Sequence, residues 1–302
     1  MLSSMKVGSP VLRVRNIDKI LAFYEKKLGL QVKRRHQDDN DGYAVYELGF
    51  VQIDYPEESL LQLHHDPNAK NPFPHSAGLF HFAILVPNRK SLASTYLALK
   101  NSGVHYDGFA DHLVSESLYL RDPENNGIEI YRDRPARDWP RDAEGNIMID
   151  TLPLNLQSIV SEIDRLEDEN VIAFPNGARV GHMHLRVTNI ESSIKFYHET
   201  LGFDITLDWT SMGAAFLSAG GYHHHVGMNT WHSMNGEGHS SNVLGLENFT
   251  ITISDMPSFN RLRSAIKSHY ISSKQQQRKQ RSDENQFMVS DPDGIQIVIR
   301  SE

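Results

Sequence analysis

The stretch VLRVRNIDKILAFYEKKLGL, at residues 11–30, returns in altered form as HLRVTNIESSIKFYHETLGF at residues 184–203, a constant offset of 173 positions. A second pair of segments also matches: GLFHFAI (78–84) with GLENFTI (245–251), and DPENNGIEI (122–130) with DPDGIQI (291–297) after a two-residue deletion. Repeats of this kind predict repeated structural units. The chain therefore consists of four related units, and the positions at which the units differ are the places to look for function.

Composition restricts the classes of function. The 302 residues suffice for two domains of ordinary size, and the formal net charge of −8 argues against a nucleic-acid partner. No apolar run approaches the ~18 residues of a membrane span, and no signal peptide precedes Val7. The absence of cysteine excludes disulfides and is compatible with the cytoplasm. We therefore expect a cytoplasmic protein, and the lack of an apolar span predicts no membrane contact. Sixteen histidines, several of them clustered, favour metal binding or acid–base chemistry.

The pattern of each unit predicts one strand, one helix and about three further strands, βαβββ. In the first unit, alternation predicts a strand at 11–14, Asn16 or Asp18 could cap the helix that follows, and Gly29 ends it. A hairpin joined near Gly49 is expected to follow, with strands at 43–48 and 50–55. The remaining predicted elements are strands at 79–86, 113–121 and 127–132, then 204–209, 213–218 and 222–229, then 286–290 and 295–300, with helices at 88–102, 190–201 and 257–269.

The predicted fold class is therefore α+β, with four βαβββ modules in two paired-module domains. Domain one spans 7–132 (modules 7–65 and 78–132), and domain two spans 179–302 (modules 179–231 and 245–302). The segment 133–178 between them is expected to be a linker with one helix, within Leu154–Glu169, that acts as a brace or dimer contact. The Gln-rich segment 275–281, which carries the basic run 278–281, is expected to be a solvated insertion.

Aligning the units with one another isolates three positions at which potential metal ligands are kept or lost. His182 corresponds to Ser9, His81 to Asn248, and Glu129 to Gln296. Two histidines and one carboxylate form the facial set typical of non-haem Fe(II) sites, with three adjacent positions left open. A lone histidine on a strand is more often structural, but the joint loss of all three elsewhere favours a metal site at His81, Glu129 and His182.

The distribution of these ligands also predicts which units pair. Units two and three carry the ligands, so we expect them to close one cup around the metal and units one and four to close a second cup without ligands. The three side chains could alternatively meet across a dimer interface. His184 shares a strand face with His182 and is the competing ligand.

Further residues are expected near this cup. In the strand predicted at 222–229, alternation places His224 on one face and His223 and His225 on the other, and one of the three can act as a general base while the others are structural. Tyr119 lies across the predicted hairpin from Glu129 and could donate a hydrogen bond to an oxygen near the metal. His112 is either a surface loop residue or part of the site.

At this point the chain resembles the vicinal oxygen chelate superfamily, and within it the two-domain extradiol ring-cleavage enzymes of the catechol 2,3-dioxygenase type. Four stretches carry the resemblance: GHMHLRVTNIESSIKFY (181–197), GGYHHHVGMNTW (220–231), GLFHFAILVPNRK (78–90) and DHLVSESLYLRDPENNGIEIYRDRP (111–135). The resemblance covers nearly the whole chain, and the fourth stretch is the most specific because it holds a histidine, a tyrosine and a glutamate of the extradiol pattern.

The resemblance implies Fe(II), with Mn(II) as the alternative, bound by His81, Glu129 and His182. It also implies His224 as acid and base, with Tyr119 and His112 beside the substrate. A catecholic substrate, dioxygen and a homodimer are the expected partners. One departure is that the ligands of well-known extradiol enzymes come from the last two modules, whereas here they fall in the middle two.

Two other functions on the same scaffold remain open at this stage. A glyoxalase-type isomerase or thiol transferase would add a fourth ligand, drawn from the 223–225 histidines, around Zn or Ni. A metal-free small-molecule binding or resistance protein would need none of the three ligands.

Overall fold

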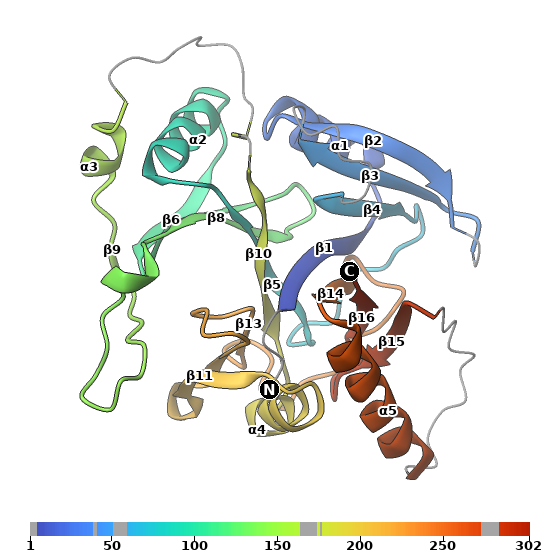
Figure 1. Cartoon of the computed structure of the whole chain (residues 1–302). Coiled ribbons are helices and arrows are strands. Elements are labelled where there is room, and N and C mark those ends of the chain that lie inside the picture. The colour runs from blue at the N-terminus through green and yellow to red at the C-terminus, as the bar shows by residue number, and fades with distance from the viewer. Residues whose placement is uncertain (1–4, 39–40, 51–58, 164–173, 176, 273–283) are drawn as a thin grey trace.

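The structure is a computed structural model that describes residues 5–38, 41–50, 59–163, 174–175, 177–272 and 284–302. It consists of four modules (Figure 1). The first three have the βαβββ order that the sequence predicts, whereas the described residues of the fourth form one strand, a helix and two further strands. The Gln-rich segment 275–281 lies outside the described residues. Among the described helices, none is both long and apolar enough to cross a membrane.

The element bounds follow the four units. Module one contains β1 (Met5–Val14), α1 (Ile17–Lys26), β2 (Leu30–Gln37), β3 (Ala44–Phe50) and β4 (Leu61–His65). Module two contains β5 (Gly78–Leu85), α2 (Arg89–Asn101), β6 (Tyr106–Asp111), β7 (Ser115–Arg121) and β8 (Gly127–Asp133). Module three contains β10 (Arg179–Arg186), α4 (Ile190–Lys195) with the π-helical turn η2 (Phe196–Thr200), β11 (Asp204–Trp209), the 3₁₀ turn η3 (Thr210–Met212), β12 (Ala214–Ser218) and β13 (Val226–Asn229). Module four contains β14 (Gly245–Ile253), α5 (Met256–Ser272), β15 (Gln286–Ser290) and β16 (Gln296–Ser301).

Repeated capping residues start the helices of three modules. The side chain of Asn16 accepts a hydrogen bond from the backbone of Lys19, and Asn88 and Asn189 repeat the arrangement at α2 and α4. An asparagine at this position satisfies a backbone N–H that the first turn leaves without a partner. Gly29 ends the first helix in the left-handed conformation, with φ of 69°, where a residue with a side chain is disfavoured.

Several predicted strands differ from the observed ones. The turn predicted at Gly49 is wrong, because β3 continues through Gly49 to Phe50. Beyond Phe50, the strand expected at 50–55 lies outside the described residues, and β3 pairs with β4. The edge strand β2 is not among the predicted strands, because its residues are largely polar and their alternation is weak. The strand expected at 113–121 begins at Ser115, since Leu113 adopts a φ of 70° in the turn after β6. The strand expected at 222–229 begins only at Val226, so the three histidines precede it.

The modules pair as the ligand distribution predicted. One sheet of nine strands, in the order β11-β12-β13-β10-β5-β8-β7-β6-β9, joins modules three and two. The other, of seven strands in the order β15-β16-β14-β1-β4-β3-β2, joins modules four and one. Antiparallel β10 and β5 form the seam of the first sheet, and antiparallel β1 and β14 form the seam of the second. The predicted domains 7–132 and 179–302, with the linker 133–178 between them, divide the chain by its sequence repeats. This division into domains stays a proposal.

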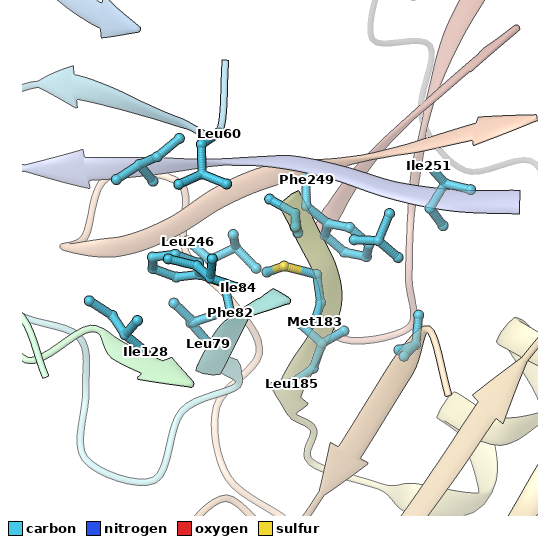
Figure 2. Close-up of a cluster of buried hydrophobic side chains, with 14 of the residues drawn as sticks. Leu60, Leu79, Phe82, Ile84, Ile128, Met183, Leu185, Leu246, Phe249 and Ile251 are labelled. Carbon is cyan, nitrogen blue, oxygen red and sulfur yellow. The ribbon is translucent and has the colours of Figure 1, made fainter. Parts of the chain in front are cut away.

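The main hydrophobic core lies between the two sheets, where the seams meet. Figure 2 shows Phe82 and Ile84 of β5 with Met183 and Leu185 of β10, facing Phe249 and other side chains of β14. All five are fully buried. Because side chains alternate along a strand, the opposite face of β5 and β10 carries His81, His182 and His184. The core thus fixes the strands whose other face forms the candidate site.

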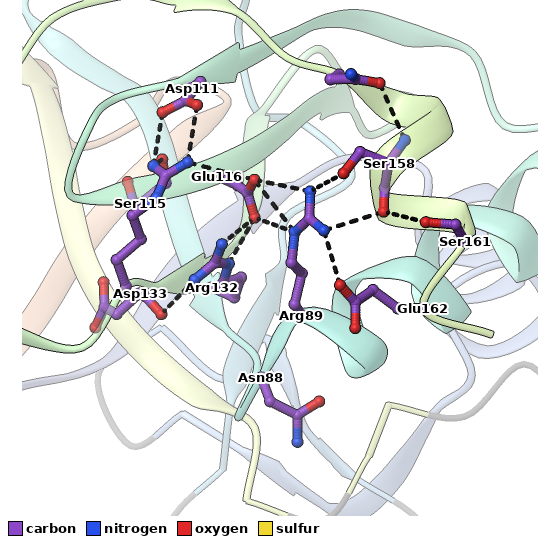
Figure 3. Close-up of polar contacts among 12 residues, drawn as sticks. Asn88, Arg89, Asp111, Ser115, Glu116, Arg132, Asp133, Ser158, Ser161 and Glu162 are labelled. Atoms are coloured by element: carbon purple, nitrogen blue, oxygen red, sulfur yellow. Dashed lines mark hydrogen bonds and ion pairs between the residues drawn. The ribbon is translucent and has the colours of Figure 1, made fainter. Parts of the chain in front are cut away.

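The linker between the sequence halves is tied to module two. It contains η1 (Ala136–Asp138), β9 (Leu152–Pro153), which pairs with β6, and α3 (Leu156–Val160). Figure 3 shows Arg89 at the start of α2 donating to the backbone oxygen and hydroxyl of Ser158, each at 3.0 Å, and to Glu116 on β7. Glu116 is 3% exposed and also binds Arg132 and Arg134. These bonds tie the linker helix α3 to module two, and the role of brace or dimer contact expected for it stays a prediction.

Register corrects one alignment drawn from the sequence. Phe82 is level with Ile128, and its repeat counterpart Phe249 is level with Ile297. The residue after Ile128 is Glu129, so the counterpart of Glu129 is Val298 and not Gln296. The sequence alignment placed a two-residue deletion in the loop before this strand. The two loops have the same length, because in each the aspartate N–H donates to the carbonyl oxygen of the residue four positions later (Asp122 to Asn126, Asp291 to Ile295).

Candidate metal centre and active site

Three side chains from adjacent strands converge on the open face of the nine-stranded sheet. His81 comes from β5, Glu129 from β8 and His182 from β10, and one ligand atom of each lies within 4.8 Å of the others. Nε2 of His81 is 2.8 Å from Oε2 of Glu129, and Nε2 of His182 is 3.0 Å from the same oxygen. The exposed fractions of the three residues are 5%, 3% and 1%. The whole set lies within one chain.

Burial and charge act in opposite directions on this set. Burial alone would raise the pKa of the Glu129 carboxyl, but the His182 and His81 imidazoles outweigh it and hold that pKa well below its usual range. Burial lowers the pKa of His182 despite the neighbouring carboxylate. The carboxylate is therefore ionised and the imidazole is neutral near pH 7, which are the protonation states that metal ligands require.

The donor set fits a divalent transition metal. Ligand atoms bound at ~2.1 Å in adjacent positions lie ~3 Å from each other, close to the measured separations between the imidazole nitrogens and Glu129. Nε2 of His81 and Nδ1 of His182 are buried and lack a hydrogen-bond partner among the described residues. Buried polar atoms without partners are uncommon, and a bound metal would satisfy the first of them.

His184, the competing ligand, points into the same cavity but is engaged otherwise. Its Nε2 lies 2.9 Å from the side-chain nitrogen of Asn229, so the amide donates to the ring. Burial, followed by the nearby His81, lowers the pKa of His184 well below its usual range. His184 lies outside the group of potential ligands formed by the other three residues.

The three consecutive histidines before β13 have different environments. His224 lines the cavity, and its ring centroid is 4.1 Å from that of His182. His223 is fully buried behind it, with Nε2 2.8 Å from Asp133. His225 lies near Ser218, with Nδ1 3.1 Å from the hydroxyl. Burial, with His182 and His223 adding to it, holds the pKa of His224 well below its usual range.

Tyr119 and His112 form a hydrogen-bonded pair on the opposite wall. The Tyr119 hydroxyl is 2.7 Å from Nε2 of His112, whose Nδ1 is 2.8 Å from the backbone oxygen of Asp150 in the linker. Because an amide oxygen only accepts, His112 carries its proton on Nδ1 and accepts from Tyr119. His112 is therefore part of the site wall, and the linker orients it.

The site opens into a cavity of about 370 Å³. Its walls are mainly apolar and aromatic and come from both modules and the linker: Phe80, Val114, Leu120, Ile128, Ile149, Trp209, Phe216 and Trp231. Sequence reasoning missed Ile149 and Thr151, which line the cavity from the linker, and it missed Asp133, which bonds to His223 behind His224. These residues can be recognised only by their proximity to the site, and that proximity arises only when the sheet has formed.

A family model described as the Glyoxalase/Bleomycin resistance protein/Dioxygenase superfamily matches residues 6–130 and 179–299. The chain belongs to this superfamily. Its two matched segments coincide with the two sequence halves, each of which contains two of the four modules, and its fold is the vicinal oxygen chelate fold.

Two named relatives of this superfamily illustrate the range. The chain is 35% identical over 287 residues to a catechol-2,3-dioxygenase from Bacillus subtilis (strain 168), which covers 95% of this chain and 93% of the relative. Among solved structures, glyoxalase I from Zea mays aligns with a TM-score of 0.58 over 99% of this chain and 92% of that chain, at 18% identity. The second likeness concerns the fold alone.

Proposed function

We propose that the protein is an Fe(II)-dependent extradiol dioxygenase that cleaves catechol or a substituted catechol next to the diol. The observation that carries the proposal is the buried set of His81, Glu129 and His182 at the bottom of an apolar cavity. The 35% identity to a catechol-2,3-dioxygenase over nearly the whole chain supports it. Both atoms of dioxygen would enter the product, a 2-hydroxymuconic semialdehyde, while one ring carbon–carbon bond breaks.

His81, Glu129 and His182 would hold the metal, which when bound brings the two substrate oxygens and dioxygen together. The apolar walls fit a flat aromatic ring and exclude water from it. His224, with its low pKa, would be neutral near pH 7 and would take a proton from a substrate hydroxyl. Burial, with Glu129 adding to it, raises the pKa of Tyr119 well above its usual range, so Tyr119 remains a hydrogen-bond donor.

The two alternative functions, a metal-dependent isomerase or transferase and a metal-free binding protein, require different sets of ligand residues in the site. A glyoxalase-type isomerase or thiol transferase would need a fourth ligand, whereas the group of potential ligands found among the described residues has three members. A metal-free binding protein would have no use for a buried carboxylate between two imidazoles, which costs free energy to bury.

The test begins with metal-free protein reconstituted anaerobically with Fe(II), Mn(II), Zn(II) or Ni(II) in separate samples. Catechol and air are then added, and oxygen consumption and coloured ring-cleavage product are measured. We expect consumption and product with Fe(II), and neither with Zn(II) or Ni(II). Isomerase activity on a thiol adduct of a 2-oxoaldehyde in the Zn(II) or Ni(II) sample, without ring cleavage by any sample, would refute the proposal.

Substitutions in the same assay exclude the metal-free alternative. His81→Ala, Glu129→Ala and His182→Ala should each lose iron and turnover. Unchanged binding of an aromatic ligand by all three, together with the absence of turnover by the wild type, would favour a binding protein.

A further inference from the structure

A chain of hydrogen bonds leads from the cavity to a carboxylate behind it. Nδ1 of His224 is 2.8 Å from Nδ1 of His223, and Nε2 of His223 is 2.8 Å from Oδ1 of Asp133 at the end of β8. The other carboxylate oxygen, Oδ2, accepts from the hydroxyl of Tyr222 at 2.9 Å. His223 is fully buried, and His224 is 8% exposed.

The chemistry of the groups fixes where the protons lie. An ionised carboxylate only accepts hydrogen bonds, so Nε2 of His223 must carry a proton toward Asp133. Nδ1 of a neutral His223 is then a lone pair, which requires that Nδ1 of His224 carry the proton between the two rings. In neutral His224 the remaining nitrogen, Nε2, is left with a free lone pair. No hydrogen bond to that nitrogen is found among the described residues, and the ring lines the cavity.

We propose that Asp133 and His223 are positioning residues that hold His224 in the tautomer with a free Nε2, ready to accept a proton from the substrate. This inference rests on the proposed function of His224. The side chains that surround the relay support its rigidity: the Trp139 ring packs against His223 at a centroid distance of 5.3 Å, and the Phe216 ring packs against His224 at 5.0 Å.

The proton balance of the step is simple. A substrate hydroxyl loses its proton to Nε2 of His224, which becomes an imidazolium, and no electrons are transferred. The new charge is shared through the existing bond from Nδ1 of His224 to His223, whose polarisation by Asp133 makes it a better acceptor. The same proton is available at Nε2 for return to a product oxygen.

Among the described residues, the seven-stranded sheet has neither a buried carboxylate at the position of Asp133 nor a histidine at the position of His224. By register, the counterpart of Asp133 is Glu302, which is exposed and paired with Lys6 at the molecular surface. Ser59 stands at the position of His224. The relay therefore belongs to the ligand-bearing half and is no general requirement of the fold.

The first test reads the tautomer directly and needs no activity. Metal-free protein with ¹⁵N-labelled histidine is studied by NMR, because the ring ¹⁵N shifts and two-bond couplings identify the protonated nitrogen. We expect His224, assigned by its loss in His224→Gln, to be protonated at Nδ1 in the wild type. In Asp133→Ala we expect a shift toward the Nε2-protonated form. A wild-type His224 protonated at Nε2 would overturn the inference.

The matched control is Tyr222→Phe, which removes the other hydrogen bond to the same carboxylate and leaves the relay intact. It should keep the His224 tautomer of the wild type, and a tautomer change as large as that of Asp133→Ala would indicate loosened packing and refute the assignment. If the protein is a dioxygenase, Asp133→Ala and His223→Leu should lower kcat by about 10²-fold with KM and iron content nearly unchanged. A fall confined to iron content or KM would contradict a positioning role.

Failure of the proposed function is distinguishable from failure of this inference. Absence of ring cleavage by the iron-loaded wild type counts against the dioxygenase, whereas the NMR result concerns the relay alone.

Discussion

The two sheets of this protein have the same architecture but different chemistry. His182 and His224 of the nine-stranded sheet have Ser9 and Ser59 as their counterparts in the seven-stranded sheet, and these two hydroxyl oxygens lie 3.5 Å apart. Asn248 stands where His81 does. One strand framework therefore supports a buried ligand set in one half and only uncharged side chains at those positions in the other.

The rim of each cup differs as much as its centre. Phe80 lines the cavity in the first cup, whereas its counterpart Glu247 accepts from Arg13 at 2.8 Å and from His64 at 2.8 Å. Asp66 binds the same arginine at 3.0 Å, so an ion network fills the region. The comparison teaches that the fold sets positions and that the side chains at those positions set function.

The largest expected difference between the cups is in metal binding. Anaerobic addition of Fe(II) at a hundredfold excess over its dissociation constant should stabilise the wild type and Asn248→Ala by about 2.7 kcal/mol. It should leave His81→Ala unstabilised, because one ligand of three is lost. Thermal unfolding with and without metal measures this. Equal stabilisation of both variants would show that the metal binds elsewhere.

A triple substitution tests whether the ligand set alone accounts for the difference in metal binding between the two cups. We expect the triple variant S9H/N248H/V298E to bind a second metal ion per chain, because register places these three residues at the positions of His182, His81 and Glu129. Metal analysis after gel filtration measures the stoichiometry. The companion S9H/N248H/Q296E follows the sequence alignment instead, so a second ion in that variant alone would contradict the structural register.

A pH experiment compares two related aspartates, Asp291 and Asp122, which bond to Tyr197 and Tyr24. Burial raises the pKa of Asp291 from 3.8 to about 7. A carboxyl with a raised folded-state pKa contributes stability below its unfolded pKa, and this contribution is lost as pH rises through the folded pKa. Between pH 4 and 7 the loss amounts to about 3 kcal/mol.

Asp291→Asn should therefore flatten the decline of unfolding free energy over that range, as measured by urea denaturation at several pH values. Asp122→Asn tests the related group, whose pKa burial also raises. A pH profile of Asp291→Asn identical to that of the wild type would exclude the predicted titration.

The smallest expected effect concerns the brace on the nine-stranded sheet. Arg89→Met removes the bonds to Ser158 and one of three arginines around buried Glu116, and it should lower the free energy of unfolding by about 1–3 kcal/mol. Arg137→Met, at an exposed pair with Asp138, should change it by less than about 0.5 kcal/mol. Urea denaturation compares the two, and equal effects would contradict the bracing role of Arg89.

Much of the architecture could be predicted from the repeats. Asn16, Asn88 and Asn189 recur before the helices, and the apolar positions of β5 and β10 recur in β1 and β14, so the number and order of the modules follow from the repeats. The pairing of the modules follows from the distribution of the ligands. The turn predicted at Gly49 was wrong because a glycine within a strand resembles a turn. The alignment of Glu129 with Gln296 was wrong because loop closure, and not the position of a glycine, determines strand register.

The sequence by itself determined which side chains are available: two imidazoles and a carboxylate in the middle modules, lost in the outer ones. Only the tertiary structure decided that they meet within one chain, that Asp133 lies behind His223, and that the linker completes the cavity with Ile149 and Thr151. Local patterns record which face of a strand a residue occupies. Contacts between segments far apart in sequence depend on how the sheets close around a shared core, and no local pattern contains that information.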